Sequence, residues 1–137
     1  MRIMAIDYGD SRTGAAVSDE SATLVGDVWV VHSKRDTDKA LALSDEAKKR
    51  GVARIVVGYP KNMDGSIGPR AKKSEQFADL LRSFTDIEVT VWDERLTTVS
   101  AHRLLDDAKK YGKKRKKTID AVAASLILES YLRSMKK

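Results

Sequence analysis

The chain has 137 residues, of which 42% are hydrophobic and 34% are charged, and its net charge is +6. This size and balance predict one globular domain with a single core over residues 1–137, and they exclude a disordered chain. No apolar stretch approaches the roughly 20 residues of a membrane span, and the absence of cysteine excludes disulfides and thiolate metal sites, so we expect a cytoplasmic protein with no membrane partner.

The first third of the chain predicts three consecutive strands. Residues 3–6 are apolar, residues 14–18 are small and apolar, and residues 24–32 are rich in valine. Gly9 and the polar stretch 18–23 supply the turns between them. The economical arrangement is a β-meander, in which each strand pairs antiparallel with the next.

The rest of the chain predicts helices that alternate with strands. Capping side chains, a proline at a helix start and a glycine at a helix end mark the boundaries. The predicted elements are a helix capped by Asp36 or Thr37 and stopped at Gly51, a strand at 52–57, a helix opened by Pro69, a strand at 87–92, a short helix capped by Thr97 or Thr98, and a final helix capped by Thr118.

Three strands followed by alternating helices and strands are the order of an α/β fold of the ribonuclease H-like type. We expect a five-stranded mixed sheet in which the first three strands are antiparallel and the later strands are parallel. Helices are expected to flank both faces. In such an open sheet, sites form at the carboxyl ends of the strands.

Three acidic residues occupy comparable places at that edge. Asp7 ends the first strand, Glu94 ends the last strand, and Asp120 lies in the first turn of the last helix. Clustered carboxylates repel one another unless cations lie between them. Mg²⁺ or Mn²⁺ prefers oxygen ligands, and two such ions roughly 4 Å apart can drive an in-line displacement at phosphorus. The three acids therefore predict a metal site that hydrolyses phosphodiesters.

Each acid alone also has a simpler interpretation. Asp7 beside Gly9 is a residue type common in turns, Asp120 can complement the helix dipole, and Glu94 can pair with a surface arginine. Strand alternation places Asp93 and Glu94 on opposite sides of the sheet, and periodicity does not choose between them. The hypothesis of a site depends on the three acids lying at one edge.

The positive charge is concentrated near the end of the sequence. Residues 1–108 have 16 Lys and Arg against 18 Asp and Glu, whereas residues 109–137 have 10 against 2. Most of the excess lies in the basic segment, residues 109–117, which runs directly toward Asp120. Such a run is either a solvated loop or a surface that binds a polyanion.

Several motifs make the chain similar to a known family. They are Asp7-Tyr-Gly-x-x-Arg-x-Gly14, Val17-Ser-Asp19, Val57-Gly-Tyr-Pro-Lys-Asn62-Met-Asp-Gly65, Asp93-Glu-Arg-Leu-Thr-Thr98 and Asp120-Ala-Val-Ala-Ala124. Over nearly its whole length the chain resembles the bacterial YqgF family, also called RuvX, of pre-16S rRNA nucleases, which were long described as Holliday-junction resolvases.

The resemblance implies a ribonuclease H fold and a nuclease dependent on Mg²⁺ or Mn²⁺ with a mechanism of the two-metal type. It places the family's catalytic and metal-binding acids at Asp7, Glu94 and Asp120, and so selects Glu94 over Asp93. The task that it implies is trimming the precursor of 16S rRNA in the cytoplasm, with ribosome-assembly particles as possible partners.

Nucleic acid is the expected partner, and the basic segment borders the predicted site. Neutralising phosphates would give affinity without sequence readout. Arg95 beside two acids can instead be a structural ion-pair partner, and Asn62 can instead belong to a rigid turn. The predicted nucleic-acid-binding residues are Arg12, Asn62, Arg95, Lys109, Lys110, Lys113, Lys114, Arg115, Lys116 and Lys117.

Three other functions are compatible with the residues. A Holliday-junction resolvase would apply the same chemistry to branched DNA, but paired incision needs a dimer, whereas we expect a monomer or weak dimer. A non-catalytic RNA-binding factor of ribosome assembly would use the basic segment alone. An actin-like ATPase also has Asp-x-Gly at a first hairpin, but it needs two such domains, and 137 residues provide one.

Overall fold

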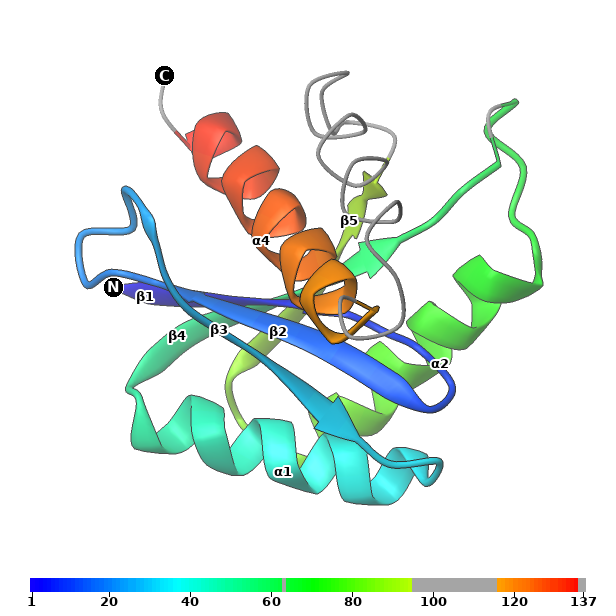
Figure 1. Cartoon of the computed structure of the whole chain (residues 1–137), viewed down its shortest axis with the longest axis horizontal. Coiled ribbons are helices and arrows are strands. Elements are labelled where there is room, and N and C mark those ends of the chain that lie inside the picture. Colours follow the sequence, from blue (N-terminus) through cyan, green and yellow to red (C-terminus); the bar gives the residue numbers. More distant parts are fainter. Residues whose placement is uncertain (63, 95–115, 136–137) are drawn as a thin grey trace.

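The computed structural model describes residues 1–62, 64–94 and 116–135, with side chains from residue 121 onward in the last range. All the described strands belong to one sheet, and the described helices lie against it (Figure 1). The elements in chain order are β1 (Arg2–Asp7), β2 (Arg12–Ser18), β3 (Val25–His32), α1 (Asp36–Lys49), β4 (Val52–Tyr59), α2 (Pro69–Phe84), β5 (Glu88–Asp93) and α4 (Lys116–Met135).

The sheet has five strands in the order β3-β2-β1-β4-β5. β1 pairs antiparallel with β2, and β2 pairs antiparallel with β3. β1 pairs parallel with β4, and β4 pairs parallel with β5. The predicted mixed sheet of the ribonuclease H-like type is therefore confirmed. The order brings the carboxyl ends of β1, β4 and β5 to the same edge.

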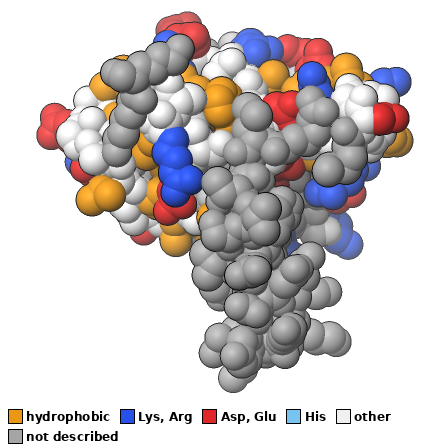
Figure 2. All heavy atoms as spheres, turned by 90° about the horizontal axis from the view of Figure 1, so that it is seen from above, with side chains coloured by type: hydrophobic (Ala, Val, Ile, Leu, Met, Phe, Trp, Pro, Cys, Tyr) orange, Lys and Arg blue, Asp and Glu red, His pale blue; other side chains and the backbone are white. Residues whose placement is uncertain are grey.

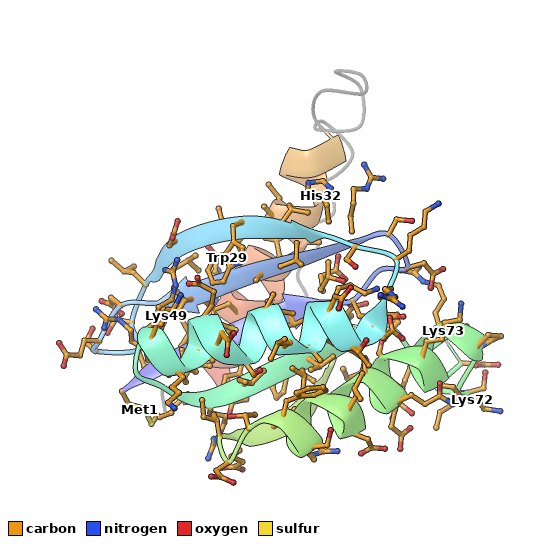
Figure 3. The ribbon with its side chains drawn as sticks, turned by 90° about the horizontal axis from the view of Figure 1, so that it is seen from below. Met1, Trp29, His32, Lys49, Lys72 and Lys73 are labelled. Atoms are coloured by element: carbon orange, nitrogen blue, oxygen red, sulfur yellow. The ribbon has the colours of Figure 1, made fainter. Side chains whose placement is uncertain are left out.

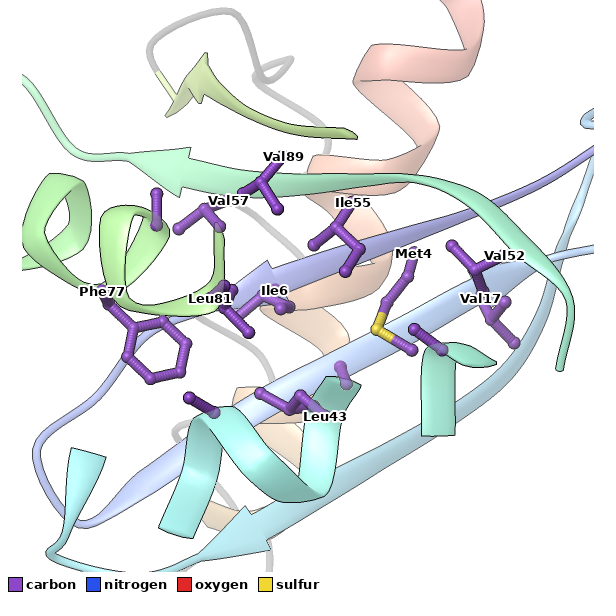
Figure 4. Packing of buried hydrophobic residues seen from close by; sticks show 14 residues of the cluster. Met4, Ile6, Val17, Leu43, Val52, Ile55, Val57, Phe77, Leu81 and Val89 are labelled. Carbon is purple, nitrogen blue, oxygen red and sulfur yellow. The ribbon is translucent and has the colours of Figure 1, made fainter. Parts of the chain in front are cut away.

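Helices cover both faces of the sheet, as the sequence predicts. α2 packs on β4 and β5, α1 packs on α2, β3 and β4, and α4 crosses the other face over β1, β2 and β3. Alternation along β1 sends Met4 and Ile6 into the core under α1 and α2, which Figure 4 shows. Ile3 and Ala5 point the other way, under α4.

The helix ends agree with the sequence in two places and differ in two. Gly51 follows the end of α1 with a φ of 68°, the left-handed conformation that glycine adopts most readily, and Pro69 is the first residue of α2. Asp36 is not a cap, because Arg35 holds that position without a side-chain hydrogen bond. Thr118 lies inside α4, which already includes Lys116. The short helix predicted after Thr97 or Thr98 falls outside the described residues.

None of the helices in the described part of the chain is both long and apolar enough to cross a membrane. On the face drawn in Figure 2, the described Lys and Arg side chains are interspersed with Asp and Glu. This mixture agrees with the near balance of charge over residues 1–108.

Candidate active site

Asp7 and Glu94 lie on either side of β4 at the carboxyl edge of the sheet. Asp7 is the last residue of β1, and Glu94 follows directly after β5. The parallel register pairs Ile6 of β1 with Val57, and Gly58 with Trp92 of β5. The two acids are 87 positions apart in the sequence, and only the parallel pairing of three strands brings them together.

Both acids lie on the face of the sheet that α4 covers. Side chains alternate along a strand, so Asp7 shares the face of Ala5, and Glu94 shares the face of Trp92. Ala5 and Trp92 both belong to the core under α4. Asp93 takes the opposite face, which it shares with Val91. The geometry therefore groups Glu94, rather than Asp93, with Asp7.

Gly58 gives Glu94 the room to reach Asp7. A Cβ atom at this position would lie 2.5 Å from Oε1 of Glu94 and 2.6 Å from Cδ1 of Ile127. Carbon atoms do not approach other heavy atoms so closely, and any side chain here would push the carboxylate away. In the sequence, Gly58 stands out only as a member of the motif that runs from Val57 to Gly65. Its role depends on a contact across the strands that periodicity does not reveal.

The carboxyl groups of Asp7 and Glu94 are within hydrogen-bonding reach of each other. Burial raises the pKa of Glu94 above the ordinary glutamate value, and the charge of Asp93 raises it further. The positive charge of Arg70 and the hydrogen bond with Asp7 act in the opposite direction. The two carboxylates thus form a partly buried negative centre whose full ionisation needs a nearby cation.

This donor set fits a divalent cation that prefers oxygen. Among the residues with described side chains, no group of three metal-binding residues is present, so the pair Asp7 and Glu94 forms the described part of the candidate centre. Asp120 is a residue of α4 whose side chain is not described. By helical spacing, position 120 lies on the same stripe as Ala124 and Ile127, both buried against the sheet.

The direction of α4 brings position 120 to the site's edge. Ile127 of α4 approaches Gly58, near the carboxyl end of β4. Tyr131, one turn further along α4, accepts a hydrogen bond from Arg54, near the amino end of β4. The helix therefore runs with its N-terminal end toward the carboxyl edge of the sheet (Figure 1). This is the arrangement that the prediction of a third acid at Asp120 requires.

A buried lysine fixes the turn that follows Asp7. Lys39 of α1 is fully buried, and its ammonium group donates hydrogen bonds to the carbonyl oxygens of Gly9, at 2.8 Å, and Asp10, at 3.0 Å. It also pairs with Asp36 at 2.9 Å. The Tyr8 ring lies 4.6 Å from the ammonium nitrogen, and its hydroxyl donates to Asp36. The turn is thereby attached to α1, and Asp7 at its start gains a fixed position.

The other predicted binding residues are distributed over the edge. Arg12 begins β2 on the same face as Gly14, which pairs with Asp7. Asn62 closes a turn: its carbonyl oxygen accepts from the Gly65 N–H, and its side-chain amide donates to Ser66. Of the remaining predictions, Lys116 and Lys117 belong to α4 without described side chains, and Arg95, Lys109, Lys110, Lys113, Lys114 and Arg115 lie outside the described residues.

Sequence reasoning missed two cations beside the site, Arg70 and Lys73. Both lie in the first two turns of α2, and Arg70 is close enough to lower the pKa of Glu94. The only signal in the sequence is a helix start, Pro69-Arg70, that contains no acid where acids are favoured. That signal indicates a cation near the site only once it is known that α2 begins close to Glu94, at the end of β5.

Comparison with known proteins places the chain in a family. The family described as "RuvX: Holliday junction resolvase" matches residues 1–134. The chain belongs to the RuvX family. A protein of Halothermothrix orenii named "Putative pre-16S rRNA nuclease" is 47% identical over 100% of this chain and 98% of its own length. A protein of the same name from Caldanaerobacter subterraneus is 43% identical over 99% of each chain. Both the family description and these names are those of phosphodiester hydrolases.

Solved structures support the same fold at much lower identity. Thermus thermophilus RuvC in complex with a Holliday junction matches with a TM-score of 0.64 and 13% identity over 98% of this chain and 96% of its own. Fowlpox virus resolvase with junction DNA matches with a TM-score of 0.61 and 13% identity over the whole of both chains. At this identity the likeness establishes the fold that RuvX proteins share with these resolvases.

Proposed function

We propose that this RuvX-family chain is a divalent-metal-dependent nuclease that processes the precursor of 16S rRNA. Asp7, Glu94 and Asp120 are the proposed catalytic and metal-binding residues. The observation that carries the proposal is the meeting of Asp7 and Glu94 beside Gly58, where burial raises the pKa of Glu94. Acids with a perturbed pKa are typical of sites where a cation or a reaction uses them.

Bound Mg²⁺ or Mn²⁺, with two ions proposed, would activate a water and stabilise the leaving oxygen of the phosphodiester. The chain's own residues prepare this centre. Asp7 and Glu94 supply carboxylate oxygens on the same face of the sheet, and Lys39 holds the turn after Asp7 in place. Arg70 balances part of the negative charge, so that an anionic phosphate can approach two acids.

RNA is the proposed substrate because the relatives from Halothermothrix orenii and Caldanaerobacter subterraneus carry the name of a putative pre-16S rRNA nuclease. The basic segment would add affinity for the phosphate backbone without reading its sequence. We further propose that the protein acts in the cytoplasm, on ribosome-assembly particles, as a monomer or weak dimer.

Branched DNA is the second candidate substrate, and the description of the matching family favours it. Resolution of a Holliday junction needs two symmetry-related sites that cut opposite strands. A chain that stays monomeric in the presence of a four-way junction would therefore speak against this candidate. Sedimentation of the protein with and without the junction measures this directly.

The deciding experiment incubates the parent protein and Asp7→Asn with labelled precursor rRNA and with a four-way junction, each with Mg²⁺, with Mn²⁺ and with EDTA. We expect metal-dependent cleavage of the RNA by the parent and at least a hundredfold loss in Asp7→Asn, because one of the metal ligands is gone. Circular dichroism checks that the variant is folded.

Cleavage by Asp7→Asn at the parent's rate would rule out the proposed metal centre. RNA binding without cleavage by the parent, under every metal condition, would instead identify a non-catalytic assembly factor.

A further inference from the structure

A pocket lies at the same edge of the sheet, between the turn after β1 and the start of α2. It has a volume of about 260 Å³ and is lined by residues 8–10 together with Pro69, Arg70, Lys73 and Ser74. Because Tyr8 follows Asp7 in the chain, one wall of the pocket is continuous with the candidate site. Figure 3 shows Lys73 at the end of α2 that approaches this turn.

The pocket contains more positive than negative charge. Arg70 and Lys73 are the cations in its lining, and Asp10 is the one acid. Lys73 pairs with Asp10 at 3.2 Å, but both side chains are more than half exposed. An exposed pair of this kind contributes little free energy, so Lys73 can turn toward an anion without a large loss.

The first turn of α2 lacks the side chains that usually accept hydrogen bonds from the free N–H groups at a helix start. Gly68 precedes the helix without a capping side chain, and the first turn has no acid. Lys72 is the first residue whose N–H bonds back, to the carbonyl of Gly68. The N–H groups of Arg70 and Ala71 therefore have no acceptor within the helix.

Ser74 provides an independent indication of a ligand. The residue is only 3% exposed, it lines the pocket, and its hydroxyl makes no hydrogen bond among the described residues. A buried hydroxyl without a partner costs free energy. Other serines in the helices donate to the carbonyl three residues earlier, namely Ser44, Ser83, Ser125 and Ser134.

We propose that this pocket binds one backbone phosphate of the substrate strand, distinct from the phosphate that is cut at Asp7 and Glu94. The chemistry is that of a phosphodiester oxyanion, which accepts from Ser74 and from the N–H groups of Arg70 and Ala71 and pairs with Lys73. Its role in catalysis depends on the proposed nuclease function. The pocket fixes how far the strand extends past the acids, and it does so without contacting a base.

Inorganic phosphate tests the pocket without any cleavage. In a ¹⁵N-correlated NMR titration we expect shifts concentrated at the amides of residues 70, 71 and 74, and a weaker response in Ser74→Ala. Lys72→Gln is the matched control, since Lys72 is an exposed neighbour in the same helix that does not line the pocket. Shifts spread evenly over exposed lysines, or unchanged in Ser74→Ala, would overturn the proposal.

A substrate strand distinguishes a backbone phosphate from a free one. Short RNAs that carry one neutral methylphosphonate, on a 2′-deoxy nucleotide at each linkage in turn, are bound to Asp7→Asn protein in Ca²⁺. We expect one linkage near the cleavage point at which neutralisation weakens binding about tenfold. In Asp7→Asn/Lys73→Gln, neutralising the same linkage should change the binding affinity very little. The slope of log affinity against log salt should become shallower by about 0.7 for each lost phosphate contact. The double variant with Lys72→Gln should behave as Asp7→Asn.

A scan in which no linkage depends on Lys73 would overturn the backbone subsite, even if the parent cleaves RNA. A peak that depends on Lys73, together with a parent that does not cleave, would support the subsite and reject the nuclease. The two proposals therefore fail separately.

Discussion

At Gly58 the chain has a hydrogen atom where any other residue would place a carbon 2.5 Å from Glu94 Oε1. The strand pattern could predict an acid at Asp7 and a second one at Asp93 or Glu94, and the resemblance to the RuvX family then selected Glu94. The strand pattern could not predict Gly58, because the requirement arises between β4 and β5, which lie side by side only in the folded sheet. Arg70 was missed for the same reason, since its reach to Glu94 crosses from α2 to β5.

Glu94→Gln should increase the stability of the metal-free protein at neutral pH while abolishing cleavage. The pKa of Glu94 is raised, mainly by burial, so its contribution to stability is present at acidic pH and is lost as pH rises through the folded-state pKa. Glutamine does not ionise and avoids that loss. Urea unfolding in EDTA, as a function of pH, measures the difference.

Glu88→Gln is the matched control, because Glu88 is an exposed acid at the other end of β5. We expect the advantage of Glu94→Gln to disappear at acidic pH and to shrink or reverse when Mg²⁺ is added. A Glu94→Gln protein that is less stable than the parent at neutral pH in EDTA would contradict this account of the site.

At the scale of elements, single residues predicted a helix end correctly where the residue acts on its own backbone. Gly51 ends α1 and Pro69 begins α2 because each residue fixes its own backbone. Asp36 or Thr37 was expected to cap α1, but both lie inside the helix, and the Asp36 carboxylate pairs with Lys39 and accepts a hydrogen bond from Tyr8. Lysine is rarely buried, so no pattern in the sequence indicates that α1 turns Lys39 inward to hold the turn after β1.

Lys39→Met should lower the free energy of unfolding by roughly 2–3 kcal/mol, because the carbonyl oxygens of Gly9 and Asp10 lose their donor. It should also slow metal-dependent cleavage, since the turn after Asp7 is no longer attached to α1. Denaturant unfolding and the cleavage assay measure the two effects.

Lys49→Met serves as the control, because Lys49 is an exposed residue of the same helix (Figure 3). We expect it to change stability by less than about 0.5 kcal/mol. Equal stability of the two variants would show that the Lys39 contacts contribute nothing net.

For the whole molecule, the fold was predictable from the order of the elements, while the course of the nucleic acid over the surface was not. The sequence places the excess positive charge in residues 109–117. The structure adds Arg70 and Lys73, which line a pocket with the turn that follows Asp7. In the sequence the basic segment leads into Asp120, so a strand bound by both sets of cations would pass across the carboxyl edge of the sheet.

Replacing Lys113 and Lys114 with Gln should weaken RNA binding and reduce the dependence of log affinity on log salt by about 1.4, if each lysine neutralises one phosphate of a single strand. The control replaces Lys48 and Lys49, which lie in the last turn of α1, at the opposite edge of the sheet. Fluorescence anisotropy over a range of salt concentrations gives both slopes, and equal slopes would exclude the basic segment from the interface.

The position of α4 has a consequence for how the protein is made. Ile3, Ala5 and Val56 are buried on the face that α4 covers, yet α4 follows all the described strands in the sequence. During translation α4 cannot cover these residues until the ribosome has produced it. The nascent sheet is then an apolar surface for a chaperone to protect, and, because Asp120 arrives with the same helix, the proposed catalytic centre cannot be complete before that moment.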